Sequence, residues 1–370
     1  MDLTELVEQL VAIDSVNPTL VPGAAGEAEL ARFVADWLEG HGLEVEFDEL
    51  AAERANVVAR ARGSGGGRSL LLNAHLDTVG LGGMADGLRP RVEGRRLYGR
   101  GAYDMKASLA ALMLAAAQAR RLGLAGDVVL TAVADEEAES IGTEAIARAV
   151  RADAAIVAEP TDLKLAIAHK GFAWFELETT GRAAHGSRYD LGVDAIALMG
   201  HVLVALDELD ERLRGDGELH PLLGGASLHA SLIEGGRELS TYPDRCVLTI
   251  ERRILPDEPI DVVEEQIRAA ASGAGADVRL SFRREPLETP RDEPIVETIL
   301  GAGKDVLGQA PEIVGVPFWT DAGLLAAAGI PSVVIGPRGE GAHADVEWVD
   351  LDSVEALYEL VVATAREFCS

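Results

Sequence analysis

The residues best suited to chemistry are histidines and acids that directly follow apolar segments of the chain. Imidazole and carboxylate groups bind divalent cations, and both can move protons. The pattern therefore indicates metal binding with proton transfer beside it. The residues concerned are His75 and Asp77 in LLLNAHLDTVG (70–80), Asp135, Glu136 and Glu137 after residues 127–134, and Glu159 after residues 154–158.

His75 and Asp77 are two positions apart, so on an extended strand their side chains point to the same face. A metal-binding imidazole commonly donates its second N–H to a carboxylate, and Asp77 is placed to accept it. The alternative is a core histidine beside a solvated aspartate. The residues of this segment alone do not separate the two interpretations.

Two loop residues extend the candidate set. Asp104 lies in GRGAYDMK, and His343 lies in the loop after the apolar segment 332–336. With Glu137 and Glu159 added to His75, the set holds two imidazoles and three carboxylates and suits a pair of Zn²⁺, Co²⁺ or Mn²⁺ ions. One carboxylate must bridge two ions that lie about 3.5–4 Å apart. Any one of these acids alone would be explained as a solvated surface residue.

Glu136 remains when Glu137 is counted as a ligand. Adjacent glutamates at a strand end can point in different directions, so one can bind metal while the other holds water. Zinc lowers the pKa of bound water to about 7, and a base must take the proton released and pass it to the leaving nitrogen. Such help is worth about 10²- to 10⁴-fold in rate. We predict that Glu136 is this base.

The elements that must position these residues form an α/β pattern. Residues 70–80, 127–134 and 154–158 are predicted as buried strands, residues 43–49 as an outer strand, and residues 106–122 as a helix. Strands separated by helices predict a mixed, mostly parallel sheet flanked by helices. Ligands bind beyond the carboxyl ends of such strands, so the acids should converge on one crevice.

A different pattern occupies residues 172–285. Strand, helix, strand, strand, helix and strand follow one another there, which is the ferredoxin-like order β-α-β-β-α-β. The α/β pattern returns after it. The expected organisation is a catalytic domain of residues 1–171 and 286–370 with a second domain inserted at 172–285.

The charge of the chain bears on its partners. The formal net charge of −29 at pH 7 argues against nucleic acid, because phosphate binding needs basic patches, and it favours cations. No segment is long and apolar enough to predict a membrane span, and the first residues lack the basic region of a signal peptide. We expect a cytoplasmic protein with no membrane partner. Cys246 and Cys369 are expected to be free.

Six motifs together resemble the co-catalytic zinc hydrolase family of acetylornithine deacetylase, succinyl-diaminopimelate desuccinylase, aminoacylase and carboxypeptidase G. They are HLDTV, GRGAYDMK, ADEEAES, AEPTD, AAHGS and GEGAHADVEWV, in that order over nearly the whole chain. The resemblance implies a zinc-peptidase-like catalytic domain in which Asp104 bridges two metal ions. It assigns His75 and Glu159 to one ion, Glu137 and His343 to the other, the base to Glu136, and support of His75 to Asp77. It also implies a cis peptide between Asp104 and Met105.

The resemblance further implies that the inserted domain is a lid and dimerisation domain. His185 in AAHGS corresponds to a histidine that reaches the partner subunit's site and binds the developing oxyanion; without the resemblance it would be a turn histidine. Arg253 matches an arginine that grips the substrate carboxylate, although the neighbouring Arg252 is an alternative. Where many relatives carry an asparagine before Pro-Asp, this chain has Ser240-Thr241-Tyr242, so Ser240 is a candidate substrate contact.

The resemblance implies a di-zinc amidohydrolase, with Co or Mn as possible replacements for zinc, that acts on an N-acyl amino acid or a short peptide as a homodimer. Acetylornithine deacetylase is the leading activity. The alternatives are a desuccinylase, an aminoacylase or a glutamate carboxypeptidase-type hydrolase with the same site, and a non-catalytic binding protein of the same fold. Glu159 favours these branches over aminopeptidases, which tend to carry Asp there.

Overall fold

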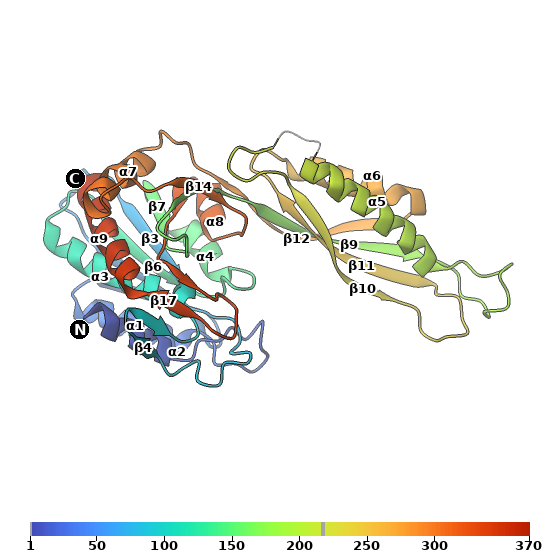
Figure 1. The fold of residues 1–370 in the computed structure, drawn as a ribbon, viewed down its shortest axis with the longest axis horizontal. Helices are drawn as coiled ribbons and strands as arrows, with labels where there is room; N and C mark the ends of the chain where they lie inside the picture. Colours follow the sequence, from blue (N-terminus) through green and yellow to red (C-terminus); the bar gives the residue numbers. More distant parts are fainter. Residues whose placement is uncertain (1, 216–218) are drawn as a thin grey trace. The chain divides into compact units, whose positions relative to one another are not determined.

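The computed structural model describes residues 2–215 and 219–370, and the chain forms two compact units (Figure 1). The first unit runs to Ile167 and resumes at Thr289–Val314 and Thr320–Ser370. The second unit consists of Ala168–Glu288 and Gly315–Trp319. Among the described helices, none combines the length and the apolar character that crossing a bilayer requires.

A mixed sheet forms the centre of the first unit. Its strand order is β1-β2-β6-β3-β7-β15-β8-β13, with β14 also paired to β8. The four strands from β6 to β15 run parallel, whereas β1 and β2 are antiparallel to their neighbours and β8 is antiparallel to β15. The strands are β1 (Glu44–Ala51), β2 (Arg54–Ala61), β3 (Leu70–His75), β6 (Val128–Val133), β7 (Ala154–Val157), β8 (Leu165–His169), β14 (Ile313–Val316) and β15 (Ser332–Val334).

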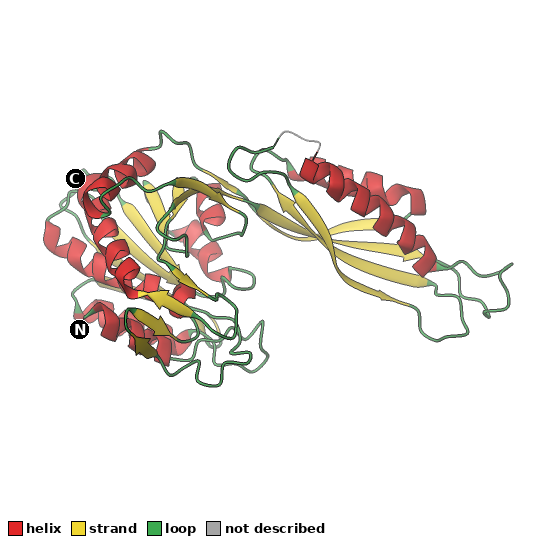
Figure 2. Ribbon diagram, viewed as in Figure 1, coloured by secondary structure: helices red, strands yellow, loops and turns green. Residues whose placement is uncertain are grey.

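Helices cover both faces of this sheet (Figure 2). Helices α3 and α9 pack together with α1 and α2 nearby, and α4 packs with α8 against β6, β7 and β15. The fully buried strands β3, β6 and β7 lie between these layers, as their continuous apolar sequences predict. The helices are α1 (Leu3–Ala12), α2 (Ala28–Gly40), α3 (Ala107–Leu122), α4 (Ile141–Ala149), α7 (Pro294–Val306), α8 (Ala322–Ala327) and α9 (Leu351–Phe368).

Helix α3 is buried on most of its surface. Eleven of its 16 residues are buried, and alanine supplies seven positions of its sequence ASLAALMLAAAQARRL. Small side chains allow the helix to approach β3, β6 and α9 closely. The helix begins directly after a short irregular turn, Ala102–Lys106, in which Asp104 and Met105 have non-helical backbone angles.

A small second sheet of the first unit was not anticipated from the sequence. Its order is β16-β17-β5-β4, and all its pairs are antiparallel. These strands are two or three residues long, and β4 is wholly exposed, so no apolar alternation marks them. They are β4 (Arg91–Glu93), β5 (Arg96–Tyr98), β16 (Gly339–Glu340) and β17 (Trp348–Asp350).

The second unit has the expected order β-α-β-β-α-β. Its sheet order is β10-β11-β9-β12, and its core is formed by apolar residues such as Phe175, Met199 and Ile250. Strand β13 (Leu287–Glu288) pairs with the end of β8. The main elements are β9 (Gly171–Thr180), α5 (Ala195–Gly215), β10 (Ser227–Gly235), β11 (Arg245–Ile254), α6 (Ile260–Ala271) and β12 (Asp277–Arg284).

One segment lies in a different unit from the one the sequence suggests. Gly315–Trp319 belongs to the second unit, although the expected division placed it in the catalytic domain. The Trp319 ring packs edge-on against Phe172, with 6.0 Å between centroids, and its N–H donates to the Glu285 carbonyl at 2.9 Å. Such a return of the chain depends on tertiary packing and leaves no periodic signal in the sequence.

Candidate active site

The candidate ligands of the first unit converge at one edge of its sheet. Strand β3 lies between β6 and β7, with His75 opposite Val133 and Asn73 opposite Val157. Because these strands are parallel and in register, the residues that follow them emerge at the same edge. Glu136, Glu137 and Glu159 therefore lie close to His75.

The first ligand group consists of His75, Asp104 and Glu159. His75 Nε2 is 3.1 Å from Asp104 Oδ1 and 3.6 Å from Glu159 Oε1. His75 Nδ1 is 2.9 Å from the main-chain carbonyl of Asp77. A carbonyl only accepts, so Nδ1 carries the hydrogen and Nε2 faces the carboxylates with its lone pair available for a metal.

The second group consists of Asp104, Glu137 and His343. His343 Nε2 is 2.9 Å from Glu137 Oε2 and 3.4 Å from Asp104 Oδ2. Asp104 thus directs one carboxylate oxygen to each group, and within each group the ligand atoms lie within 4.8 Å of one another. The Asp104-Met105 peptide is cis, as the resemblance implies.

Asp77 supports the site differently from the expectation. Its carboxylate is 3.6 Å from His75 Nδ1, so the main-chain carbonyl and not the carboxylate makes the short contact. The carboxylate instead accepts the main-chain N–H groups of Glu136 and Glu137, both at 3.1 Å. Asp77 therefore orients the turn that carries the proposed base and a ligand.

A buried polar network behind Asp77 was missed in the sequence. Asn17 Nδ2 donates to Asp77 Oδ2 at 2.8 Å and to Asp135 Oδ1 at 3.0 Å. Arg54 donates to Asn17 Oδ1 at 2.6 Å and forms an ion pair with Asp135. Glu27, which is also buried, lies 4.0 Å from Arg54. The SVNP segment indicated only a helix break, because the carboxylates that Asn17 contacts are 60 and 118 residues away.

The carboxylates strongly perturb one another. Burial, followed by the charge of Glu159, raises the pKa of Glu136 well above its ordinary value. Burial and the charge of Asp104 likewise raise the pKa of Glu137. Burial raises the pKa of Glu159 well above its usual range, although the charge of His75 opposes it. Several acids packed together out of water call for positive charge in their midst.

The pKa values of the two histidines are raised as well, because the nearby carboxylates favour the charged ring. Burial alone would lower the pKa of His75, but Glu159 and Asp104 raise it well above its ordinary value. Hydrogen bonds to Asp104 and Glu137 raise the pKa of His343 to about 10. An oxygen and nitrogen donor set without sulfur, crowded with acids and split into two groups, fits two divalent ions of the borderline class.

A model of the peptidase family M20/M25/M40 matches residues 71–367. The chain belongs to this family. This confirms the family predicted from the motifs and the enzyme class, a metal-dependent hydrolase acting on amide bonds.

Curated relatives match over the full length of this family member. Acetylornithine deacetylase of Myxococcus xanthus is 30% identical, with 99% of this chain and 96% of that protein covered. The enzyme of the same name from Proteus mirabilis (strain HI4320) is 28% identical, with the same coverage.

Solved structures confirm the fold. The aminopeptidase PepT of Bacillus cereus ATCC 10987 superposes with a TM-score of 0.82 at 19% identity, covering 100% of this chain and 98% of that one. An M20 family metallo-carboxypeptidase of Sulfolobus solfataricus gives 0.81 at 18% identity, covering 100% and 99%. The YXEP protein of Bacillus subtilis, described as a dinuclear metal binding peptidase from the M20 family, gives 0.74 at 17% identity, covering 99% and 97%.

Two predicted residues of this M20 chain meet in the second unit. His185 forms an isolated bridge with Thr241, and the Gly186 N–H donates to the Ser240 carbonyl at 2.7 Å. His185 Nδ1 accepts the main-chain N–H of Ser187 at 3.2 Å. The hydrogen is therefore on Nε2, which makes this exposed ring a hydrogen-bond donor.

Arg252 and Arg253 point to opposite faces of β11. The Arg252 side chain is fully buried and bound to Glu258 at 2.6 Å. Arg253 is partly exposed, donates to Glu251 at 2.7 Å and lies over the Phe172 ring. Arg253 is therefore the more accessible of the two. Arg253 lies eight residues along β11 from Arg245, which is roughly 26 Å on an extended strand. It is therefore remote from the segment just before β11, where Thr241 contacts His185.

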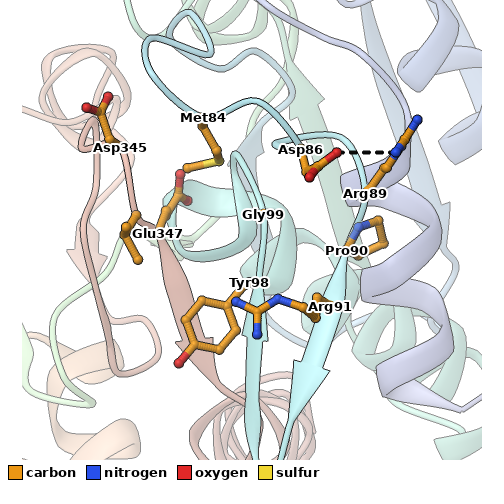
Figure 3. Close-up of a pocket in the computed structure, with 10 residues that line it drawn as sticks. Met84, Asp86, Arg89, Pro90, Arg91, Tyr98, Gly99, Asp345 and Glu347 are labelled. Atoms are coloured by element: carbon orange, nitrogen blue, oxygen red, sulfur yellow. Dashed lines mark hydrogen bonds and ion pairs between the residues drawn. The ribbon is translucent and has the colours of Figure 1, made fainter.

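A hollow of about 440 Å³ lies beside the His343 loop (Figure 3). Met84, Tyr98, Asp345 and Glu347 are among its lining residues, and those residues include none of the predicted ligands. We assign no part of the reaction to the hollow itself. Glu347 is nonetheless important, because its carboxylate turns toward the main chain of the Asp104 loop.

Proposed function

We propose that the chain removes an acyl group from the α-nitrogen of an amino acid with the help of two divalent ions, zinc in the first instance, and that N-acetylornithine is the leading substrate. The observation that carries this proposal is the pair of ligand groups that share Asp104. The full-length similarity to acetylornithine deacetylases supports the choice of substrate.

The residues have distinct roles in this proposal. His75 and Glu159 would hold one ion, Glu137 and His343 the other, and Asp104 both. The ions, when bound, would polarise the scissile carbonyl and lower the pKa of water. Glu136 would accept the proton of the attacking water and deliver it to the leaving nitrogen. The turn that presents Glu136 is held by the Asp77 carboxylate.

We assign substrate recognition and oxyanion stabilisation to the second unit. Arg253 would pair with the substrate carboxylate, and the Ser240 segment would contact the substrate beside His185. His185 Nε2 would donate to the developing oxyanion. Arg253 lies near the far end of β11 from the Thr241 segment that contacts His185, which supports the idea that each active site takes its His185 from a second copy of the chain.

A homodimer through β10 would supply that second copy. Within the described part of the chain, β10 pairs with β11 alone, and its residues from His229 to Gly235 are exposed. Leu232 and Ile233 are 71% and 55% exposed. An exposed apolar edge strand readily pairs with another strand, and the same edge of a second copy would satisfy its free N–H and carbonyl groups.

Solution size and activity test the dimer together. We expect Leu232→Lys to yield a monomer with strongly reduced activity, whereas Leu20→Lys, at an exposed apolar position of the first unit, should leave both unchanged. Sedimentation or light scattering would measure the size. A fully active monomer would contradict the role of His185 in a partner's site.

The substrate is tested by hydrolysis rates on N-acetylornithine, N-succinyl-diaminopimelate, other N-acyl amino acids and small dipeptides. Each is assayed with metal-stripped protein and after Zn²⁺ or Co²⁺ is restored. Metal-dependent cleavage of N-acetylornithine above the other substrates is the expected result. Preference for another compound would instead support activity as a desuccinylase, an aminoacylase or a carboxypeptidase. Two bound ions without turnover of any compound would favour a binding protein.

A further inference from the structure

Glu347 is a buried carboxylate that holds the main chain around Asp104. The residue is 2% exposed. Its Oε1 accepts the N–H groups of Tyr103 at 2.8 Å and Asp104 at 3.1 Å, and its Oε2 accepts the Gly101 N–H at 3.0 Å. Three donors from one short loop therefore converge on a single side chain.

Arg100 extends this contact to two more segments. It donates to Glu347 Oε2 at 2.8 Å, to the Ala344 carbonyl at 2.9 Å and to the Gly80 carbonyl at 3.2 Å. Ala344 follows His343 in the chain, and Gly80 closes the segment that begins with β3. The Arg100–Glu347 pair thus connects the loop that carries Asp104 to the loop that carries His343.

A purely structural ion pair does not explain this arrangement well. A buried ion pair is weak evidence for stability, because apolar residues of similar volume often serve as well. Apolar residues could not accept three main-chain N–H groups or donate to two carbonyls. What the pair provides is a fixed orientation of the main chain on either side of the second ligand group.

We propose that Glu347 and Arg100 are positioning residues that align Asp104 with His343, so that both metal ions bind in one geometry. This inference rests on the proposed two-metal function. Glu347 accepts hydrogen bonds from the main chain of the Asp104 loop and acts through that main chain. Arg100 acts in the same way on the His343 loop.

The test is Co²⁺ binding to Glu347→Gln, followed by titration and by the visible absorption spectrum of the bound ion. The amide keeps an oxygen for Tyr103 and Asp104, but its NH₂ group faces the donors of Gly101 and Arg100. We expect affinity to fall by about 10- to 100-fold and the spectrum to change. The matched control is Glu355→Gln, which breaks the exposed Arg95–Glu355 pair and should bind Co²⁺ like the wild type.

A second variant covers the case in which Glu347→Gln does not fold. Arg100→Lys keeps the positive charge beside Glu347 but cannot reach both carbonyls. We expect weakened Co²⁺ binding with a changed spectrum and an unaltered far-ultraviolet circular dichroism spectrum. Wild-type affinity and spectrum in the folded variants would overturn the inference. A wild-type protein that binds no pair of ions would instead overturn the proposed function.

Discussion

The two histidines of the candidate metal centre are held in opposite ways. The His75 side chain ends the central strand β3, is 1% exposed, and has its ring fixed by a carbonyl two residues along. His343 lies on a loop with a positive φ of 62°, and its side chain is 54% exposed. Sheet register places the first, whereas side-chain contacts from other segments must place the second. A metal centre can therefore combine a rigid half with a half that depends on its supports.

The largest expected effect comes from a variant that removes proton transfer but keeps metal binding. It lies in the half of the site formed by the residues at the strand ends, called here the strand-end half. Glu136→Gln keeps the shape of the side chain but removes its basicity. We expect kcat to fall by at least about 10²- to 10⁴-fold, while the amount of bound metal stays at two ions per chain. Steady-state kinetics and elemental analysis measure the two quantities. Activity near that of the wild type would remove Glu136 from its role.

Replacing each histidine by alanine tests the comparison directly. Both variants should lose metal affinity. In the metal-free protein His75→Ala should cost more, about 1–3 kcal/mol, because it leaves a cavity at a buried strand end. His343→Ala leaves no such cavity and should cost less, through the loss of its contacts with Asp104 and Glu137. Urea denaturation in the presence of a chelator measures both. Equal destabilisation would show that the two halves do not differ.

Asn17→Ala weakens the buried hydrogen-bond network that supports Asp77 and Asp135 in the strand-end half. It removes two donated hydrogen bonds from buried carboxylates, and through Asp77 it loosens the turn of Glu136 and Glu137. We expect kcat to fall by about 10- to 100-fold with a smaller change in KM. Thr19→Ala, which removes another acceptor of Arg54, is the matched control and should have a weaker effect. Unchanged kcat in Asn17→Ala would remove the network from the site.

The last prediction concerns pH. Burial, followed by the charge of Asp77, raises the pKa of Glu27 from 4.5 to about 8, so the folded protein retains a proton that the unfolded chain has lost. Stability should therefore fall as the pH rises from 6 to 8, by about 2 kcal/mol from this residue alone. Glu27→Gln should flatten that slope. Denaturation curves at pH 6, 7 and 8 measure it, and an unchanged slope would show that Glu27 is ionised in the fold.

The strand-end residues could be predicted because their signal is local. Apolar runs mark β3, β6 and β7, and parallel strands bring the residues after them to one edge. The roles of Asp104 and His343 could be predicted only from the motifs that contain them, because loop residues show no periodic pattern. The contacts of Asn17 with Asp77 and Asp135, and those of Glu347 with the Asp104 loop, span 60 or more residues, so no local sequence pattern predicts them. Glu347 lies within the motif GEGAHADVEWV. Its proposed role depends on hydrogen bonds from main-chain N–H groups, which cannot be predicted from the sequence.

The second unit shows the same limit. The order of its strands and helices follows from alternation and helical periodicity, and it agrees with the structure. The sequence left Arg252 and Arg253 as alternatives, and burial distinguishes them, since only Arg252 is enclosed. Adjacent strand residues face opposite sides, but which side is covered depends on helices packed from elsewhere in the chain.

Helix α3 has a consequence for how this sequence can vary. Its alanines are enclosed from several directions, so a larger side chain has to displace a neighbouring strand or helix, typically at about 1–3 kcal/mol. A saturation library across Ala107–Leu122 should therefore tolerate little more than glycine and serine at the enclosed alanines. The exposed β4 should accept most replacements. Tolerance to substitution would then depend on how closely the neighbouring main chain encloses a residue. By this measure α3, which carries no proposed catalytic group, should tolerate fewer substitutions than β4.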